Sequence, residues 1–303
     1  MKKFNGKMPG ILHASDLKTP KGKIAHWVMF VYLCIACIFA VFPSLWILLS
    51  AFKDTQEIYS GFSLLPEHFT FGGAIDSIKT AWQTLELGTS VLNTFLMSLG
   101  SLAMTIVVCG FGGYVLSRLR PRGGKFILAL VLWTMMMPTQ MRTVPLYMSW
   151  MHFPFASSGG MGIIDTYWPI WFNAAANAFN VLLFKNCFDS VSLSLVEAGK
   201  IDGCSDIGIF FRIMVPLSMP VIIYVSILTM SGAWSEFFIP YLVLQSKELQ
   251  IMPVRIFLLK SDKTVQMNVY MMALIFASLP PFVIFLFFQK YIMGGINIGG
   301  VKG

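Results

Sequence analysis

The chain has 303 residues, of which 56% are hydrophobic and only 12% carry a charge, with a formal net charge of +8. An ordinary soluble domain has about 25% charged residues, so this composition excludes a soluble globular protein and indicates a polytopic membrane protein. Apolar stretches of roughly 20 residues recur along the whole sequence, which predicts one continuous helical bundle without a separate soluble domain.

We predict an all-α membrane protein with six transmembrane helices, because a helix needs roughly 20 apolar residues to cross a bilayer. The apolar runs are Ile24–Ala51, Val91–Ser117, Phe126–Trp150, Ile163–Phe184, Ile213–Trp234 and Tyr270–Ile292. The first run is too long for a signal-peptide core, so we expect it to remain as an anchor. These runs divide the chain into an N-terminal segment (1–23), a transmembrane domain (24–293) and a tail (294–303).

The basic residues predict the direction of the spans. Six lysines precede the first span, and Arg118, Arg120, Arg122 and Lys125 follow the second, whereas the first loop on the other side has five acidic residues and two lysines. Segments rich in Lys and Arg stay in the cytoplasm, so we expect both termini and the loop between spans four and five to be cytoplasmic. The positive charge therefore indicates orientation in a lipid bilayer, and we expect no nucleic-acid partner.

The loop between spans four and five, residues 190–216, contains an unusual concentration of charged and small residues. Asp202-Gly203 is a strong turn or helix-stop pair, and Ser205 or Asp206 can cap a following helix, so we predict two short helices joined by a turn. The apolar face is supplied by Leu193, Leu195, Val196, Ala198 and Ile201. Small residues and the single charge of Glu197 suit docking into a groove on a soluble partner, but an ordinary solvated loop explains the same residues.

The segment EAGKIDGCSDIGIFFRIMVP resembles the EAA loop of importer-type ABC permeases. That pattern is EAA, three residues, G, nine residues, I, one residue and LP, and it is met by Glu197, Ala198, Gly203, Ile213 and Pro216. The sequence departs from it at Gly199, in place of the second alanine, and at Val215, in place of leucine. The resemblance implies that the residues coupling the chain to an ATPase are Glu197, Ala198, Gly199, Asp202 and Gly203, with Glu197 transmitting force and performing no chemistry.

Other segments are similar to the maltose-type, multi-sugar permeases of carbohydrate ABC importers, so that the resemblance covers nearly the whole chain. These segments are PTQMRTVPLYMSW, GIIDTYWPIW, WSEFFIPYLVL and GGINIGGVKG. The resemblance implies a type I importer bundle in a bacterial or archaeal inner membrane, importing a sugar or oligosaccharide by alternating access. It also implies three partners: a second, different permease, an ATPase dimer that binds ATP and Mg, and an extracytoplasmic solute-binding protein. In relatives a tail such as 294–303 can reach toward the ATPases.

A few polar residues at membrane depth are candidates for a sugar path, because polar groups there are costly and normally face a cavity or a partner. Asn173, Asn177 and Asn180 share one face of a continuous helix. The resemblance adds Trp234 and Glu236, in its W-x-E-F segment. Asparagines that bridge neighbouring helices, and aromatic anchors at the membrane interface, explain the same residues. Arg142 and Glu236 form an ion pair, or one of them meets substrate or the binding protein; the sequence leaves this open.

Several alternatives are disfavoured by the residues. The chain has no GxxxxGK[ST] pattern, its five cysteines lack zinc spacing and its four histidines lie apart, so we expect no enzyme and no cofactor of its own. A secondary transporter predicts carboxylates in mid-span and inverted repeats, and neither is evident. A scaffold or sensor would leave the Glu197 loop without an ATPase, which copurification would reveal. We expect residues 245–266 to form a polar outer loop that contacts the binding protein or serves as a plain connection.

Overall fold

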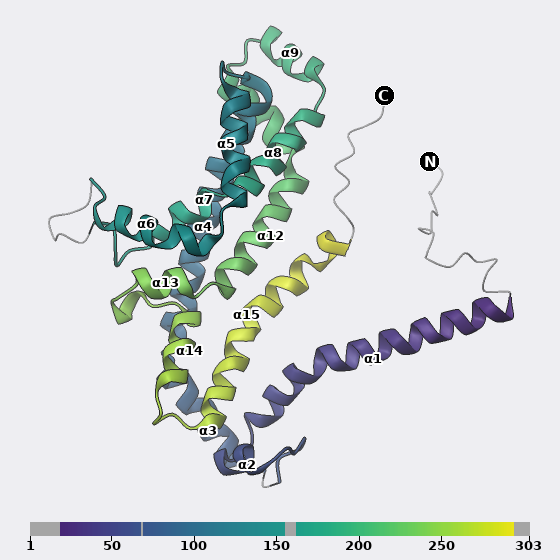
Figure 1. The fold of residues 1–303 in the computed structure, drawn as a ribbon, viewed down its shortest axis with the longest axis vertical. Helices are drawn as coiled ribbons and strands as arrows, with labels where there is room; N and C mark the ends of the chain where they lie inside the picture. The colour runs from purple at the N-terminus through teal and green to yellow at the C-terminus, as the bar shows by residue number, and fades with distance from the viewer. Residues whose placement is uncertain (1–18, 68, 155–161, 294–303) are drawn as a thin grey trace.

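The computed structural model describes residues 19–67, 69–154 and 162–293 (Figure 1). Most of the predicted N-terminal segment and all of the tail 294–303 lie outside the described residues. In chain order the α-helices are α1 Pro20–Ser50, α2 Thr55–Ser60, α3 Phe71–Thr84, α4 Leu87–Tyr114, α5 Gly124–Met136, α6 Thr139–Met151, α7 Trp168–Ala175, α8 Ala178–Ser190, α9 Leu193–Ile201, α10 Asp206–Ile209, α11 Val215–Leu217, α12 Met219–Ser235, α13 Phe238–Val243, α14 Met252–Ser261 and α15 Met267–Met293. Two π-helical segments, Val115–Leu119 and Phe210–Met214, and a short 3-10 helix, Lys247–Leu249, complete the helical elements.

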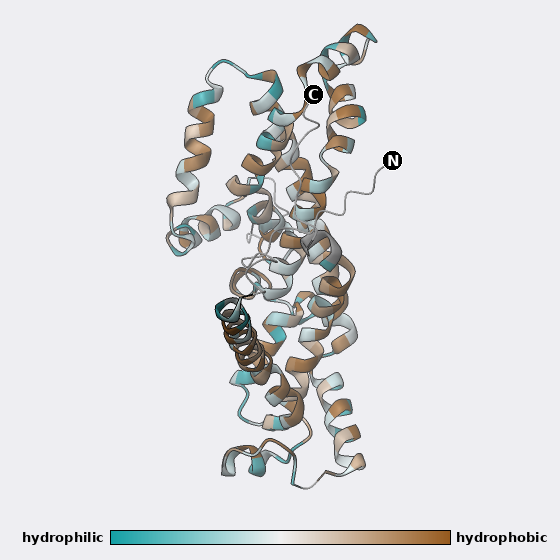
Figure 2. Cartoon of the chain, turned by 90° about the vertical axis from the view of Figure 1, so that its right-hand side faces the viewer, coloured by the Kyte–Doolittle hydropathy of each residue, from teal (hydrophilic) through white to brown (hydrophobic). Residues whose placement is uncertain are grey.

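The predicted all-α membrane fold is confirmed, since the described residues contain helices and no strand. By length and composition, three helices can each cross a membrane: α1, α4 with its continuation to Leu119, and α15. Two pairs of helices bent by 77°, α8 with α9 and α10–α11 with α12, raise the number to five if each pair is one span. Figure 2 shows that apolar residues make up much of the helical part of the chain.

The predicted third span is interrupted, so the count of six spans is not confirmed. Helix α5 ends at Met136, and α6 begins at Thr139. Met137 has extended dihedral angles (φ −80°, ψ 123°), because a following proline disfavours the helical conformation of the residue before it. Pro138 also lacks the backbone N–H that a continuous helix would need. The part of the chain from Phe126 to Trp150 is therefore two shorter helices.

The predicted fourth span is also divided, between α7 and α8. The side chain of Asn177 accepts a hydrogen bond from the backbone N–H of Asn180 at 3.0 Å and caps the start of α8. Asn173 lies on α7, before the break. Sequence reasoning placed the three asparagines on one face of a continuous helix. This prediction is wrong, because the helix is broken between Asn173 and Asn180.

Helix α4 is the centre of the bundle and packs against α7, α8 and α12. Its buried residues include small hydroxyl side chains at helical spacing, Ser90, Thr94, Ser98, Ser101 and Thr105. The hydroxyls of Thr94 and Ser98 donate to backbone carbonyls one turn earlier, both at 2.6 Å, so these polar groups are satisfied within the helix. Small side chains let neighbouring helices approach closely in a membrane bundle.

The two ends of the molecule carry different elements. Helix α9 and the turn between α4 and α5 lie at one end, and α2, α3 and the turn between α14 and α15 lie at the opposite end (Figure 1). Helix α1 contacts α15 near its own C-terminal end but leaves the bundle along most of its length, and its most apolar stretch has no buried residue (Figure 1). Helices α9 and α10, in the predicted docking loop, therefore lie at the end of the molecule opposite α2 and α3 (Figure 1).

Candidate functional site

The candidate docking element is the helix–turn–helix formed by α9 and α10, as the local sequence signals predict. Helix α9 ends at Ile201 with Asp202 as its C-cap, and Gly203 follows with a φ of +78°, the left-handed conformation that glycine adopts without steric cost. Ser205 is the N-cap of α10, because its hydroxyl oxygen accepts a hydrogen bond from the N–H of Gly208 at 3.1 Å. The predicted turn and the predicted Ser205 cap are therefore confirmed.

The residues predicted to form the apolar face of α9 do not all lie on its buried side. Val196 and Gly199 are buried, and they face the chain's own core. Leu193 and Ile201 are 54% and 86% exposed. The remaining predicted members of the face and of the coupling set, Leu195, Glu197, Ala198, Asp202 and Gly203, are also exposed. Most of the predicted apolar face is thus on the outside of the element, together with Glu197.

The smallness of Gly199 is used within the chain. A Cβ atom at this position would come within 2.8 Å of Ile213 Cδ1 and 3.4 Å of Ile209 Cγ1. Ile209 is fully buried in a core that also includes Val196 on α9 and Phe188 on α8. The close approach of α9 to the following helix therefore depends on the missing side chain of Gly199.

Hydrogen bonds attach the α9–α10 element to the end of α4. Tyr114 donates its hydroxyl hydrogen to the carbonyl oxygen of Asp206 at 3.1 Å. The guanidinium of Arg118 donates to the carbonyl oxygens of Phe188 and Val191, at the end of α8 just before α9. These contacts, with the shared apolar core, make the element a rigid extension of α4 and α8.

A second candidate site is a polar cavity of about 470 Å³ between the helices. Its lining combines residues from five parts of the chain, including Thr105, Thr139, Arg142, Asn173, Asn177, Asn180, Thr229 and Glu236. The fold thus brings the three predicted asparagines together with Arg142 and Glu236, although the helices that carry them are broken. Amides, hydroxyls and one charge of each sign give the cavity both donors and acceptors.

The charged groups of this cavity do not form the ion pair considered from the sequence. Within the described residues, no oxygen of Glu236 lies within 4.0 Å of a nitrogen of Arg142. Glu236 Oε1 instead accepts hydrogen bonds from the N–H groups of Phe238 (2.9 Å) and Ile239 (3.3 Å). The Nε atom of Arg142 is buried and has no partner in the described part of the chain. Arg142 therefore has hydrogen-bonding capacity in this cavity that the described chain does not use.

Trp234 is placed differently from the other candidates of the sugar path. The side chain of Trp234 is 7% exposed. It belongs to a buried apolar cluster with Leu85 and Met252. It is not among the residues that line the polar cavity. The structure therefore brings together the three asparagines and Glu236 but not Trp234.

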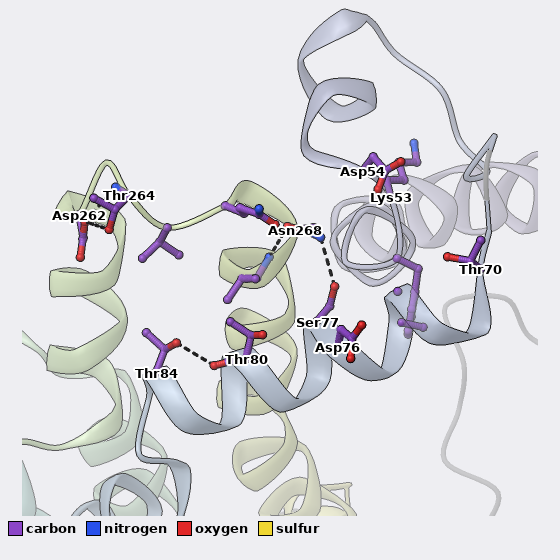
Figure 3. A pocket seen from close by; sticks show the side chains of 16 residues that line it. Lys53, Asp54, Thr70, Asp76, Ser77, Thr80, Thr84, Asp262, Thr264 and Asn268 are labelled. Carbon is purple, nitrogen blue, oxygen red and sulfur yellow. Dashed lines mark hydrogen bonds between the residues drawn. The ribbon is translucent and has the colours of Figure 1, made fainter.

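The opposite end of the molecule has a larger hollow, of about 570 Å³, shown in Figure 3. Its walls are formed by residues 52–54, which follow α1, by helix α3, by the turn between α14 and α15, and by the start of α15. Asn268 donates to the hydroxyl oxygen of Ser77 at 3.1 Å and thereby joins α15 to α3 (Figure 3). Hydrogen bonds from the side chain and backbone of Thr264 lower the pKa of the Asp262 carboxyl. Asp54 and Asp76 also line this hollow, beside Lys53.

Sequence reasoning did not predict the ion pairs that Glu86 forms with Lys247 and Arg255. Residues 245–266 were expected to form a polar loop, but they contain α14, and its Arg255 is 6% exposed. Arg255 donates to the carbonyl oxygens of Leu85 (2.9 Å) and Lys247 (2.8 Å) and pairs with Glu86 at 2.9 Å. Lys247 pairs with Glu86 as well, at 2.5 Å. An arginine among apolar residues was the only signal of this burial.

A bundle of apolar helices around a polar cavity, with a projecting helix–turn–helix at one end, defines the class of a membrane permease. The profile of the family described as "Binding-protein-dependent transport system inner membrane component" matches residues 106–297, well over half of the chain, and the protein belongs to this family. The membership of ABC importer permeases expected from the sequence is thereby confirmed.

Particular relatives support this assignment. The chain is 30% identical over 271 residues to "Arabinooligosaccharides transport system permease protein AraQ" of Bacillus subtilis, covering 87% of this chain and 91% of the relative. The crystal structure of a bacterial ABC transporter involved in the import of the acidic polysaccharide alginate has a chain with the same fold, with a TM-score of 0.75 and 22% identity over 90% of this chain and 98% of that chain. A related structure, in complex with an alginate pentasaccharide-bound periplasmic protein, gives a TM-score of 0.65 at 14% identity over 92% and 97%.

Proposed function

We propose that this chain is the transmembrane permease subunit of an ATP-driven importer of a sugar or oligosaccharide. It passes substrate from an extracytoplasmic binding protein across the membrane by alternating access. Its partners are a second permease, an ATPase dimer that performs the ATP hydrolysis, and the binding protein. The family, the arabinooligosaccharide relative and the alginate transporter that holds a periplasmic protein support this proposal.

The observation that carries the proposal is the contrast between the two faces of α9. Its inner face is fixed to the cores of α4 and α8, whereas Leu193, Ile201 and Glu197 remain exposed. An ATPase that binds this outer face and closes on ATP would move α9 together with α8, as one rigid body. Glu197 supplies the directional charge of the docking surface. In this proposal the α9 end and both termini are cytoplasmic.

The polar cavity is the proposed path of the sugar. Carbohydrate recognition needs hydrogen-bond donors and acceptors that converge on one space, and Asn173, Arg142 and Glu236 meet this requirement from three different helices or their ends. Asn177 and Asn180 complete the lining at the start of α8. Trp234 is not part of this proposed path, because it lies in an apolar cluster with Leu85 and Met252 and does not line the cavity.

The decisive experiment is charge reversal at Glu197 in the assembled transporter. Glu197→Lys is expected to insert normally but to lose retention of the ATPase on copurification, and with it the sugar-stimulated ATP turnover. Glu67→Lys makes the same charge change at an exposed position near the opposite end and should keep the ATPase bound. Full sugar-stimulated turnover in Glu197→Lys would contradict the proposal, as would transport at the normal rate by an assembly that lacks the ATPase.

A further inference from the structure

A third cavity, of about 630 Å³, lies between helix α8 and the turn that joins α4 to α5. It is separate from both the α9–α10 element and the polar cavity. Its lining residues are Leu116, Arg120, Pro121, Gly123, Gly124, Lys125, Leu128, Lys185 and Asp189. This combination of cations and apolar side chains has no role in the function proposed above.

The cavity has an excess of positive charge that the chain itself does not neutralise. Lys185 pairs with Asp189 at 2.5 Å, and Asp189 also accepts the hydroxyl hydrogen of Ser117 at 2.6 Å. Arg120 and Lys125 have no ion-pair partner in the ranges that the structure describes. Arg120 donates one hydrogen bond from Nε to the carbonyl oxygen of Ser117 at 3.0 Å, which uses one of its five donors. Two cations therefore remain for an anion.

The other wall of the cavity is apolar and continues onto the surface of a membrane helix. Leu116 and Leu128 line the cavity. Beside them, Phe126 and Ile127 on α5 are 68% and 45% exposed. The cavity lies where a helix of membrane-spanning length ends, at Leu119, and where the apolar helix α5 begins. It thus has cations at the expected boundary between lipid and water and apolar side chains on the lipid side.

We propose that this cavity binds an anionic phospholipid. The phosphate of the headgroup contacts Arg120 and Lys125, with Lys185 at the rim, and an acyl chain follows Leu116 and Leu128. Basic pockets between membrane helices are suited to anionic headgroups, and the adjoining apolar wall distinguishes a phospholipid from a free phosphate ion, which has no use for it. Charge complementarity and the position at the end of α4 together select this occupant.

The site is physically linked to the attachment of α9. Arg120 is two residues after Arg118, whose guanidinium binds the carbonyl oxygens of Phe188 and Val191. Asp189 belongs to the same helix end and lines the cavity. A bound headgroup would therefore hold together the end of α4, the start of α5 and the end of α8. The lipid composition of the membrane would then affect how firmly α9 is held.

The experiment uses the full chain purified in detergent, with native mass spectrometry of phosphatidylglycerol and phosphatidylcholine as probes. The protein is expected to retain phosphatidylglycerol in preference to phosphatidylcholine. Each cation near a membrane surface changes the affinity for anionic lipid roughly five-fold, so Arg120→Gln with Lys125→Gln should weaken phosphatidylglycerol binding roughly 25-fold. Binding of phosphatidylcholine should not change.

Matched variants separate the site from general charge effects and from misfolding. Arg122→Gln removes an exposed cation from the same turn that does not line the cavity, and it should change binding little. Lys125→Arg keeps the charge and should keep the preference for phosphatidylglycerol. Equal retention of the two lipids by the unmodified protein would overturn the proposal, and so would an Arg122→Gln loss as large as that of the double variant. Displacement of the lipid by excess inorganic phosphate would assign the cavity to a free anion instead.

Discussion

Gly199 of α9 lies directly against Ile213, and a Cβ atom on Gly199 would come within 2.8 Å of Ile213 Cδ1. This contact joins α9 to the π-helical segment Phe210–Met214, which directly follows α10. It also gives a physical meaning to the departure from the EAA pattern, which has alanine at this position. In this chain a glycine accommodates the end of the isoleucine side chain.

Substitutions at Gly199 should depend steeply on size. In Gly199→Ala, the terminal methyl group of Ile213 has to move, but alanine favours the helix by about 1 kcal/mol, so the net change in unfolding free energy should stay within about 1 kcal/mol. Gly199→Leu should cost about 1–3 kcal/mol through overpacking and displace α9. Thermal unfolding measures the change in stability, and ATPase copurification measures the effect of displacing α9. Ile213→Val, which removes the Cδ1 atom, should partly rescue Gly199→Leu; the absence of any rescue would contradict this contact.

Asn177 should affect stability more than substrate binding, because its side chain is the N-cap of α8. Asn177→Ala removes this cap and should lower the unfolding free energy by about 1 kcal/mol, whereas Asn177→Asp keeps the acceptor and should be nearly neutral. Thermal unfolding of the two variants tests this prediction. Asn173→Ala is the comparison for a cavity residue on α7, and it should alter sugar uptake with little change in stability. An Asn177→Ala variant as stable as the unmodified protein would argue against the capping role.

Glu236 combines a charge in the polar cavity with two hydrogen bonds to the start of α13. Glu236→Gln keeps an oxygen acceptor for the N–H groups of Phe238 and Ile239, so its stability should remain close to that of the unmodified protein. Glu236→Ala loses the acceptor and should cost about 1 kcal/mol. If the charge acts on substrate, Glu236→Gln should reduce sugar uptake in proteoliposomes while keeping its stability. Equal destabilisation by both substitutions would refute this separation.

The ion pairs of Glu86 should make stability depend on acid pH. Hydrogen bonds from Lys247 and Arg255 lower the pKa of Glu86 from its ordinary value of 4.5. A carboxyl group with a lowered pKa stabilises the folded state at pH values above 4.5, and this contribution is lost as the pH falls through the lowered pKa. The difference in melting temperature between the unmodified protein and Glu86→Gln should therefore be positive at neutral pH and shrink below pH 4.5.

Two controls belong to this pH experiment. Glu248→Gln removes a carboxylate beside Lys247 that is exposed and has no ion pair in the described structure, so at neutral pH it should change the melting temperature less than Glu86→Gln does. High salt should reduce the Glu86 difference, because Glu86 is accessible to solvent and its ion pairs are screened. A Glu86→Gln difference that grows on acidification would have the wrong sign for this mechanism.

Much of the candidate docking element could be predicted because its signals are local. The Asp202–Gly203 turn and the Ser205 cap depend on backbone conformation and on hydrogen bonds within a few residues, and both are present. Which face of α9 packs inward could not be predicted in this way. Val196 is buried in a core with Tyr114 at the end of α4 and Phe188 on α8, so its burial depends partly on a residue far away in the chain.

The interruption between α5 and α6 had a signal in the sequence that apolar length alone does not use. Pro138 ends the helical conformation one residue earlier, at Met137, although the whole run is apolar enough for one span. The break before α8 is harder to foresee, because Asn177 fits either a helix interior or a cap. In the structure the Asn177 side chain accepts a hydrogen bond from the N–H of Asn180 and is therefore a cap. The sequence around Asn177 does not distinguish this role from a position inside a helix.

The sequence by itself determined that this protein is an all-helical membrane protein with a helix–turn–helix before its fifth predicted span, because hydropathy, turn residues and capping act over short distances. Only the tertiary structure decided that Arg142, Asn173 and Glu236 meet in one cavity and that Arg255 is buried against Glu86. Those arrangements depend on how separate helices pack around α4. Packing contacts between residues far apart in the chain leave no periodic pattern that one sequence can reveal.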